Sequence, residues 1–424
     1  MTRLALLITL LVAVSGAACN QGAALLDERT DQVGTSGAAA IGRDEGDCVP
    51  SETRQPNAPD QRPEFAGQTR ACTDKSDVEF DVVVLARGLQ HPWAVEPLPG
   101  GDLLVTERPG RMRIITAKGD MGASIDGVPD VDARGQGGLL DVALSPEFDS
   151  DRTIFWSYTE SRQGGNATSV AKAMLSADRR RLEQVQVIFR SMPAYQGDKH
   201  FGSRLLFDRE GLLYITLGER SDTRMRPHAQ RLSSHLGKIV RIKTDGSVPD
   251  DNPFVDTPDA LPEIWTRGHR NVQAAAFDQN GRLWVVEHGT RGGDELNLIE
   301  EGKNYGWPIV AYGIEYAGGP IMGTETTRAG HESPRYYWDP VIAPSGAEFY
   351  TGRAFPDWRG SLFVGSLKDS KLVRLTLDNE RVTGEEHLLA DRRQRVRDVR
   401  QGPDGALYVV TDEANGELWR IAPR

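Results

Sequence analysis

A histidine and a glutamate lie at nearly equal distances on either side of one predicted turn. The turn spans Asp208–Gly211, with His200 nine or ten residues before its centre and Glu219 nine or ten residues after it. In an antiparallel hairpin, residues equidistant from the turn lie side by side. We therefore expect the imidazole and the carboxylate to meet, as a general base meets the group that orients it. A solvent-exposed His–Glu pair is the alternative.

Other hairpins bring polar side chains to the same end of their strands. Arg270 stands opposite residues 287–289 across one turn, and Arg395 stands opposite Asp412 across another. The groups expected at this end are Gln136, His200, Arg270, Asn271, Lys368, Arg395 and Arg397. Each alone is consistent with a strand end in solvent. Together they predict a cationic pocket for a polyanionic ligand, within a chain whose net charge is −11.

A glycine-rich acidic segment follows the fourth hairpin. Residues 289–295 read Gly-Thr-Arg-Gly-Gly-Asp-Glu, and Asn304–Pro308 follow shortly after. Glycines allow backbone carbonyls to turn inward, and Asp and Glu supply hard oxygen ligands, which suits Ca²⁺ better than a transition metal. The segment lacks the regular ligand spacing of a helix–loop–helix calcium loop. An ordinary turn with solvated acids is therefore the alternative.

The elements that must position these groups are short β-hairpins, which recur from about residue 80 onward. Each joins an apolar strand to a second β-rich strand through a turn, usually rich in Pro, Asp or Gly. The first strands are expected at 93–98, 139–144, 205–207, 272–277, 347–350 and 396–400. Six units spaced about 45–80 residues apart predict an all-β fold, a six-bladed β-propeller with long rim loops. The alternative is a β-sandwich followed by a second β domain.

The N-terminus has the pattern of a secretory signal. Arg3 precedes an apolar run from Leu4 to Val14, and small residues lead to Cys19; the run is too short to span a membrane. Small residues ending on a cysteine resemble a bacterial lipoprotein signal, whereas ordinary cleavage after Ala18 is the alternative. We expect a signal peptide at 1–19, a flexible tether and lead-in at 20–75, and the propeller at 76–424. The expected location is the bacterial periplasm or cell envelope, with membrane contact only through a lipid at Cys19.

The cysteine count and the charge exclude several classes of protein. The 424 residues include three cysteines, all in the first fifth of the chain, which excludes a disulfide-rich scaffold and a cysteine-built zinc site in the main body. In an exported protein without Cys19, Cys48 and Cys72 either pair or remain free thiols. The acidic balance does not favour binding to phosphate backbones, so we expect no nucleic-acid partner.

Seven phrases in order carry more information than any single residue. They are GQGGLLDVA at 135–143, HFGSRL at 200–205, GHRN at 268–271, GDELNLI at 293–299 continuing to NYGWP at 304–308, APSG at 343–346, SLK at 366–368 and RVRDV at 395–399. These phrases resemble the glucose/sorbosone dehydrogenase family, soluble sugar dehydrogenases that use pyrroloquinoline quinone (PQQ). The resemblance runs from about Phe80 to Ile421 and is nearest to the bacterial aldose sugar dehydrogenase branch. It implies a six-bladed propeller, in agreement with the hairpins.

The resemblance also implies an activity and roles for residues. It implies oxidation of aldose sugars at C1 to lactones, with hydride passing to the quinone and electrons to an external acceptor. His200 would be the general base, Glu219 would orient it in place of the family's usual Asp, and Arg270 would stabilise oxyanion character. The residues implied to hold PQQ are Gln136, Arg270, Asn271, Lys368, Arg395 and Arg397.

Calcium is the second cofactor that the resemblance implies. One ion beside PQQ would polarise its carbonyls as a Lewis acid. The ligands implied for a second ion are Gly289, Thr290, Glu295, Tyr305 and, by spacing only, Glu315. Two positions depart from the family pattern. Thr290 replaces a common proline, and Lys199 precedes the base where some members have an acid, which would lower the imidazole pKa.

Two other functional classes stay open alongside the dehydrogenase. One is a non-catalytic propeller that binds carbohydrate or protein, against which the retained His200 and Arg270 argue. The other is a calcium-dependent lactonase-type hydrolase, which needs an exposed metal at the channel centre rather than a cationic pocket. His269 and His288 compete with His200 as the base, and we prefer His200 because it combines a family phrase with an opposing carboxylate.

Overall fold

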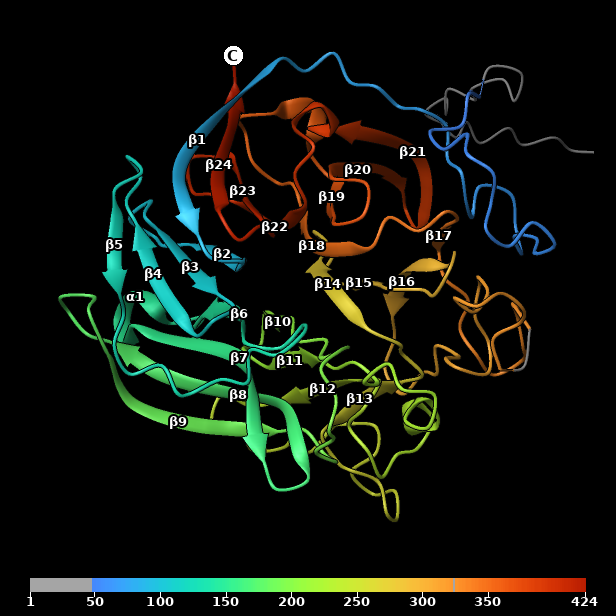
Figure 1. Ribbon diagram of the computed structural model, residues 1–424, viewed down its shortest axis with the longest axis horizontal. Coiled ribbons are helices and arrows are strands. Elements are labelled where there is room, and N and C mark those ends of the chain that lie inside the picture. Colours follow the sequence, from blue (N-terminus) through green and yellow to red (C-terminus); the bar gives the residue numbers. More distant parts are fainter. Residues whose placement is uncertain (1–47, 323–324) are drawn as a thin grey trace, which may run out of the picture. The chain divides into compact units, whose positions relative to one another are not determined.

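Six antiparallel sheets of four strands each surround a central axis (Figure 1). The computed structural model describes residues 48–322 and 325–424. The predicted signal peptide and the first part of the predicted tether lie outside this range. The prediction of an all-β six-bladed propeller is confirmed. Within the described residues, no helix is long and apolar enough to cross a membrane.

Each sheet forms one blade, and its strands follow one another outward from the axis. One blade contains β2 (Pro92–Pro97), β3 (Leu103–Glu107), β4 (Arg111–Ile115) and β5 (Met121–Ser124). The next contains β6 (Leu139–Leu144), β7 (Thr153–Arg162), β8 (Gly165–Leu175) and β9 (Leu182–Arg190). The third contains β10 (Leu205–Phe207), β11 (Leu213–Thr216), β12 (Lys238–Ile242) and β13 (Ile264–Arg267). The first strands predicted for these blades therefore form, within a few residues of their expected bounds.

The remaining blades repeat the pattern. The fourth contains β14 (Val272–Phe277), β15 (Leu283–Glu287), β16 (Asp294–Ile299) and β17 (Tyr336–Trp338). The fifth contains β18 (Pro344–Phe349), β19 (Leu362–Ser366), β20 (Lys371–Asp378) and β21 (Arg381–Leu388). The sixth contains β22 (Val396–Gln401), β23 (Leu407–Thr411), β24 (Gly416–Pro423) and β1 (Phe80–Leu89). The helical turns are α1 (Phe148–Asp151), η2 (Arg226–Ala229), η3 (Pro356–Trp358) and η4 (Ala390–Arg392).

The ring is closed by a strand from the start of the domain. β1 pairs antiparallel with β24, from Phe80 opposite Pro423 to Leu89 opposite Gly416. The inner strands β2, β6, β10, β14, β18 and β22 each contact the next, and β22 contacts β2. Closure leaves the ring without an open side, so each blade packs between two neighbours.

Buried side chains fill the spaces between neighbouring blades. Trp93 and Leu104 of one blade pack in one cluster with Trp156 and Tyr158 of the next. The inner strands carry small residues where the sheets crowd at the axis, such as the alanines of Val272–Phe277. Large side chains pack between the blades from both inner and outer strands, as Trp93 of β2 and Trp156 of β7 do.

Residues 48–75, which we call the N-terminal clasp, differ from the flexible tether expected over 20–75. A disulfide joins Cys48 to Cys72, so the pairing that the sequence left open is present. Gln68 is fully buried, and its side chain donates to the carbonyl of Pro334 (2.8 Å) and accepts from the hydroxyl of Tyr312 (3.0 Å). The clasp is packed on the propeller because it buries side chains and satisfies its polar groups there.

Removing the disulfide is expected to destabilise the protein. The bond closes a loop between residues 24 apart in sequence, and a loop of this size contributes about 3–4 kcal/mol in the chain-entropy model. A variant with Cys48→Ser and Cys72→Ser should lose about that much free energy of unfolding, measured by denaturant titration beside oxidised and reduced wild type. The reduced wild type should match the variant. Equal midpoints for all three samples would contradict this prediction.

Candidate active site

A cavity of about 630 Å³ opens at the end of the channel where the inner strands begin and the second strands end. Five of the six residues predicted to hold the cofactor line it: Gln136, Asn271, Lys368, Arg395 and Arg397. They come from loops and strand ends of four blades, as the hairpin pattern predicts. His200, Glu219 and Arg270 are not among its lining residues. His200 and Arg270 directly precede the lining residues Phe201 and Asn271 in sequence.

His200 and Glu219 meet as the register of β10 and β11 predicts. The Nδ1 atom of His200 lies 2.7 Å from Oε1 of Glu219, and both side chains are buried. The backbone N–H of His200 donates to Oε1 of Gln136 (2.8 Å). Close approach requires glycine at position 218, because a Cβ there would lie 2.3 Å from the carbonyl oxygen of His200. The base is therefore held at both its ring and its backbone.

Burial sets the protonation of this pair. It lowers the pKa of His200 well below the ordinary value, and the charges of Arg270 and Lys199 lower this pKa further. The effect of Lys199 has the direction predicted from its position before the base. Burial also raises the pKa of Glu219 to about 7, although Arg270 and Arg226 oppose the rise. The imidazole is neutral at neutral pH. Its Nδ1–H donates to Glu219, which leaves the Nε2 lone pair free to accept a proton.

Of the two competing histidines, His269 has both ring nitrogens engaged, and His288 has its Nε2 engaged. His269 also meets a carboxylate, which the sequence analysis did not anticipate, because Nδ1 lies 2.9 Å from Oε1 of Glu287. Its Nε2 lies 2.9 Å from the hydroxyl oxygen of Thr266, so neither nitrogen is free. His288 lines the cavity, and its Nε2 donates to the carbonyl of Pro344 (2.6 Å). His200 differs from His288 in that a carboxylate rather than a backbone carbonyl orients its ring, and this favours His200 as the proton acceptor.

Arg270 is fixed by the hairpin of β14 and β15. Its backbone N–H donates to Oε2 of Glu287 (2.6 Å), and its guanidinium donates to the carbonyls of His288 (3.0 Å) and Gly289. A further contact reaches the hydroxyl of Tyr316 (3.3 Å). The Nε atom of Arg270 is buried without a hydrogen-bond partner among the described residues. An arginine held in this way presents a fixed positive charge beside the base.

A cationic wall surrounds the carboxylate of Asp412. Arg395 and Arg397 each donate to its Oδ2 (3.1 and 3.3 Å). Burial alone would raise the pKa of Asp412, but the two guanidinium groups hold it well below its ordinary value. Arg397 also donates to Oε1 of Gln273 (3.0 Å), and within the described range its buried Nε has no partner. With Lys368 nearby, this wall carries more positive charge than Asp412 neutralises.

Sequence reasoning missed several residues at the site. Trp93 is the second residue of the inner strand β2 and lines the cavity, with the guanidinium carbon of Arg397 5.4 Å from its ring centre. Arg220 donates to the carbonyls of Lys199 (3.1 Å) and Gly197 (2.8 Å) and so supports the loop that carries His200. The hairpin pattern contained a signal for Trp93, because the first strand predicted at 93–98 begins there, at the end of the hairpin where the other blades place their site residues. Nothing in the pattern indicated the contacts of Arg220.

The residues predicted to bind calcium lie at two adjoining cavities. Gly289, Glu295 and Tyr305 line a small cavity of about 10 Å³, and Gly289 and Thr290 line the main cavity. Burial, and then the charge of Glu287 on the paired strand, raise the pKa of Glu295 to about 8. In the part of the chain that is described, no group of three or more His, Cys, Asp or Glu side chains is arranged to hold a metal.

Glu315, which was predicted as a further ligand by spacing only, forms an ion pair with an arginine. The guanidinium of Arg226 donates to both carboxylate oxygens of Glu315. Its Nη1 contacts Oε1, and its Nη2 lies 3.1 Å from Oε2. This ion pair lowers the pKa of Glu315. The prediction rested on spacing alone, which could not show that an arginine 89 residues earlier in the chain occupies this carboxylate.

Comparisons with known proteins agree with this geometry. The family model described as Glucose / Sorbosone dehydrogenase matches residues 89–420. Aldose sugar dehydrogenase YliI from Escherichia coli K12 is 45% identical over 348 residues, which cover 81% of this chain and 93% of that protein. The apo-form crystal structure of the soluble aldose sugar dehydrogenase from Escherichia coli has 44% identity and a TM-score of 0.78, and covers 81% of this chain and 100% of its own. The PQQ-bound aldose sugar dehydrogenase from Streptomyces coelicolor has 29% identity and a TM-score of 0.67, covering 82% and 100%. The chain therefore belongs to the glucose/sorbosone dehydrogenase family.

Proposed function

We propose that the protein is a PQQ-dependent dehydrogenase that oxidises aldose sugars at C1 to lactones and passes the electrons to an external acceptor. The observation that carries the proposal is the buried, neutral His200, with one nitrogen held by Glu219 and the other free, beside a cavity with a cationic wall. The names of the related proteins support a sugar substrate, and the PQQ-bound relative supports the cofactor.

The residues at the cavity fit the chemistry of PQQ. The cofactor carries three carboxylates, and Lys368, Arg395 and Arg397 line one cavity. The buried Nε atoms of Arg108 and Arg397 have no hydrogen-bond partner among the described residues. Buried donors are costly to leave unpaired, so an anionic ligand that accepts from them would stabilise the site.

The reaction divides between the cofactor and the side chains. Bound PQQ would supply the acceptor for the hydride that leaves C1 of the sugar. The Nε2 atom of His200 takes the proton from the C1 hydroxyl, so that the C1–O bond becomes the lactone carbonyl. Glu219 accepts the Nδ1 hydrogen bond and keeps the imidazole in the correct tautomer. Arg270 offers its positive charge to the negative charge that develops during hydride transfer.

Calcium is part of the same proposal. Gly289 and Thr290 would offer backbone carbonyls to the second ion, and the carbonyl of Gly289 also accepts from Arg270. Glu295 and Tyr305 would offer a carboxylate and a backbone carbonyl at the smaller neighbouring cavity. Such hard oxygen donors suit Ca²⁺. Glu315 is not included because Arg226 already holds it.

Reconstitution tests the proposed function. The purified protein supplied with PQQ and Ca²⁺ should reduce a redox dye when given aldoses, and should do so more slowly when Ca²⁺ is chelated. His200→Ala should bind PQQ with unchanged affinity but lose about 10²–10⁴-fold in kcat, the usual contribution of a general base. His331→Ala, which changes a histidine away from the cavity, is the matched control. A wild type that binds no PQQ at micromolar concentration would favour the non-catalytic propeller.

The pH dependence should report Glu219 rather than His200. As the pH falls through about 7, Glu219 gains a proton and no longer accepts from Nδ1 of the imidazole. We therefore expect kcat to fall with pH in that range. Glu219→Gln should have a lower kcat without this acidic limb, because its amide does not titrate. Profiles of kcat against pH between about 5 and 9, recorded for the wild type and for Glu219→Gln, test for this limb. An identical acidic limb in the variant would refute its assignment to Glu219.

We further propose that the chain is exported and attached to the cell envelope through Cys19. The N-terminal signal pattern supports export, as does the Cys48–Cys72 disulfide, since such bonds persist in oxidising compartments. Fractionation of cells should recover the wild type with membranes and a Cys19→Ser variant in the soluble periplasmic fraction. If both proteins are recovered as soluble, the lipid anchor is excluded.

A further inference from the structure

We propose that the N-terminal clasp forms part of the sugar-binding wall, with Asn57 as a specificity-determining residue. The inference rests on the proposed function and adds an element to it. The clasp precedes the family match, which begins at residue 89. It is therefore a part of this chain that the family model does not describe, although Asn57 lines the candidate active-site cavity.

The base of the clasp is built into a blade. The backbone N–H of Glu385 on β21 donates to the carbonyl of Cys72 (2.9 Å), and the N–H of Asp74 donates to the carbonyl of Glu385 (3.1 Å). Thr73 thereby forms a parallel bridge with Glu385 at the outer edge of the sheet. Beside this edge, the N–H of Ser51 donates to the carbonyl of Ala71 (2.9 Å), and the disulfide joins the two arms of the clasp.

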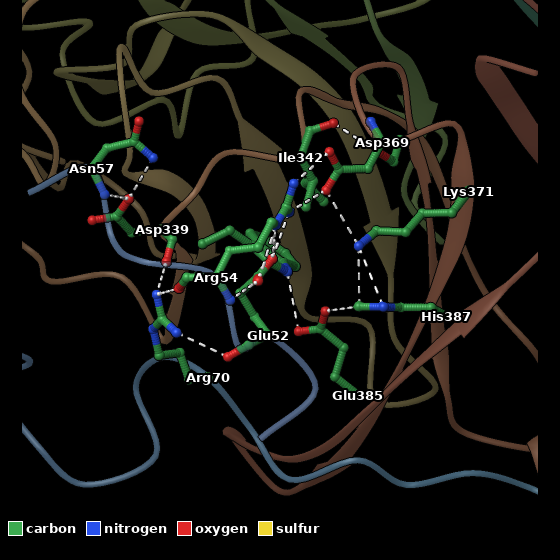
Figure 2. A network of polar contacts seen from close by, with 12 residues as sticks. Glu52, Arg54, Asn57, Arg70, Asp339, Ile342, Asp369, Lys371, Glu385 and His387 are labelled. Carbon is green, nitrogen blue, oxygen red and sulfur yellow. Dashed lines mark hydrogen bonds and ion pairs between the residues drawn. The ribbon is translucent and has the colours of Figure 1, made fainter. Parts of the chain in front are cut away.

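Asp339 fixes the point where the clasp reaches the cavity (Figure 2). One of its carboxylate oxygens accepts from the backbone N–H of Asn57 (2.7 Å), and the other accepts from the N–H of Ala58 (3.0 Å). The guanidinium of Arg70 donates to the carbonyls of Asp339 (2.8 Å) and Arg54 (2.7 Å). These bonds position Asn57 through its backbone.

The side chain of Asn57 joins the clasp to a loop of the active-site wall. Its Oδ1 accepts from Nε of Arg291 (3.2 Å), and its Nδ2 donates to Asp339 (3.1 Å). Arg291 directly follows Gly289 and Thr290, and all three line the cavity with Asn57. Asn57 and Arg291 therefore place an amide and a guanidinium side by side on the wall. Such groups form hydrogen bonds with hydroxyl-rich ligands and orient them.

A second contact of the clasp supports the loop of the cofactor lysine. Arg54 donates to both carboxylate oxygens of Asp369, at 2.6 and 3.2 Å, and Asp369 directly follows Lys368 (Figure 2). Arg54 thus positions the loop that carries Lys368, whereas Asn57 lines the cavity itself. His200 engages the hydroxyl that reacts, so the separate wall at Asn57 acts on the other hydroxyls of the sugar and thereby on the choice among aldoses.

The test compares Asn57→Ala with Gln55→Ala, a matched change at an exposed neighbouring position of the same clasp. Loss of one hydrogen-bonding group should raise KM about tenfold for the best aldose, with kcat changed by less than about twofold, and should change the ranking of a panel of mono- and disaccharides. The affinity for PQQ, measured by titration of the protein with the cofactor, should stay at the wild-type value. Gln55→Ala should match the wild type in every measurement.

The outcomes separate this inference from the proposed function. A wild type without PQQ-dependent sugar oxidation would overturn the proposed function, and the role of Asn57 with it. An active wild type with Asn57→Ala unchanged for every sugar would overturn the role of Asn57 alone. Weaker PQQ binding by Asn57→Ala would also overturn it, since the wall would then serve the cofactor. Reduction of the Cys48–Cys72 disulfide in the wild type should raise KM in the same direction as Asn57→Ala.

Discussion

The pairing of β1 with β24 is the constraint on which the rest of the structure depends. It joins a strand from the start of the domain to the last strand and closes the six blades into a ring. Closure places the beginnings of all six inner strands around one mouth of the channel. Residues far apart in sequence, such as Gln136 and Arg397, line one cavity for this reason.

Burial at that mouth gives ordinary side chains their expected chemistry. His200 and Glu219 share one hydrogen bond in a site where neither charge is well solvated, so the imidazole stays neutral and able to accept a proton. Arg270 supplies fixed positive charge near this pair, and Arg395 and Arg397 concentrate more of it around Asp412. A chain with a net charge of −11 thus has a local environment suited to a polyanion.

The parts of the fold that depend on local pattern could be predicted from the sequence. Hairpin register brought His200 to Glu219 and Arg395 to Asp412, because the distance from a turn determines which residues face each other. Contacts between distant segments could not be predicted in this way. Asn57 and Asp339 are 282 residues apart. Arg226, which pairs with Glu315, lies 89 residues before it, in the loop between β11 and β12. Neither periodicity nor turn chemistry encodes such pairs.

The most direct measurement is a crystal structure of the protein with PQQ, Ca²⁺ and an aldose bound. We predict that the PQQ carboxylates lie against Lys368, Arg395 and Arg397. We also predict that the C1 hydroxyl of the sugar lies within hydrogen-bond distance of Nε2 of His200, which requires about 2.6–3.2 Å between the two atoms. A cofactor bound outside this cavity, or a C1 hydroxyl held by a different side chain, would contradict these predictions.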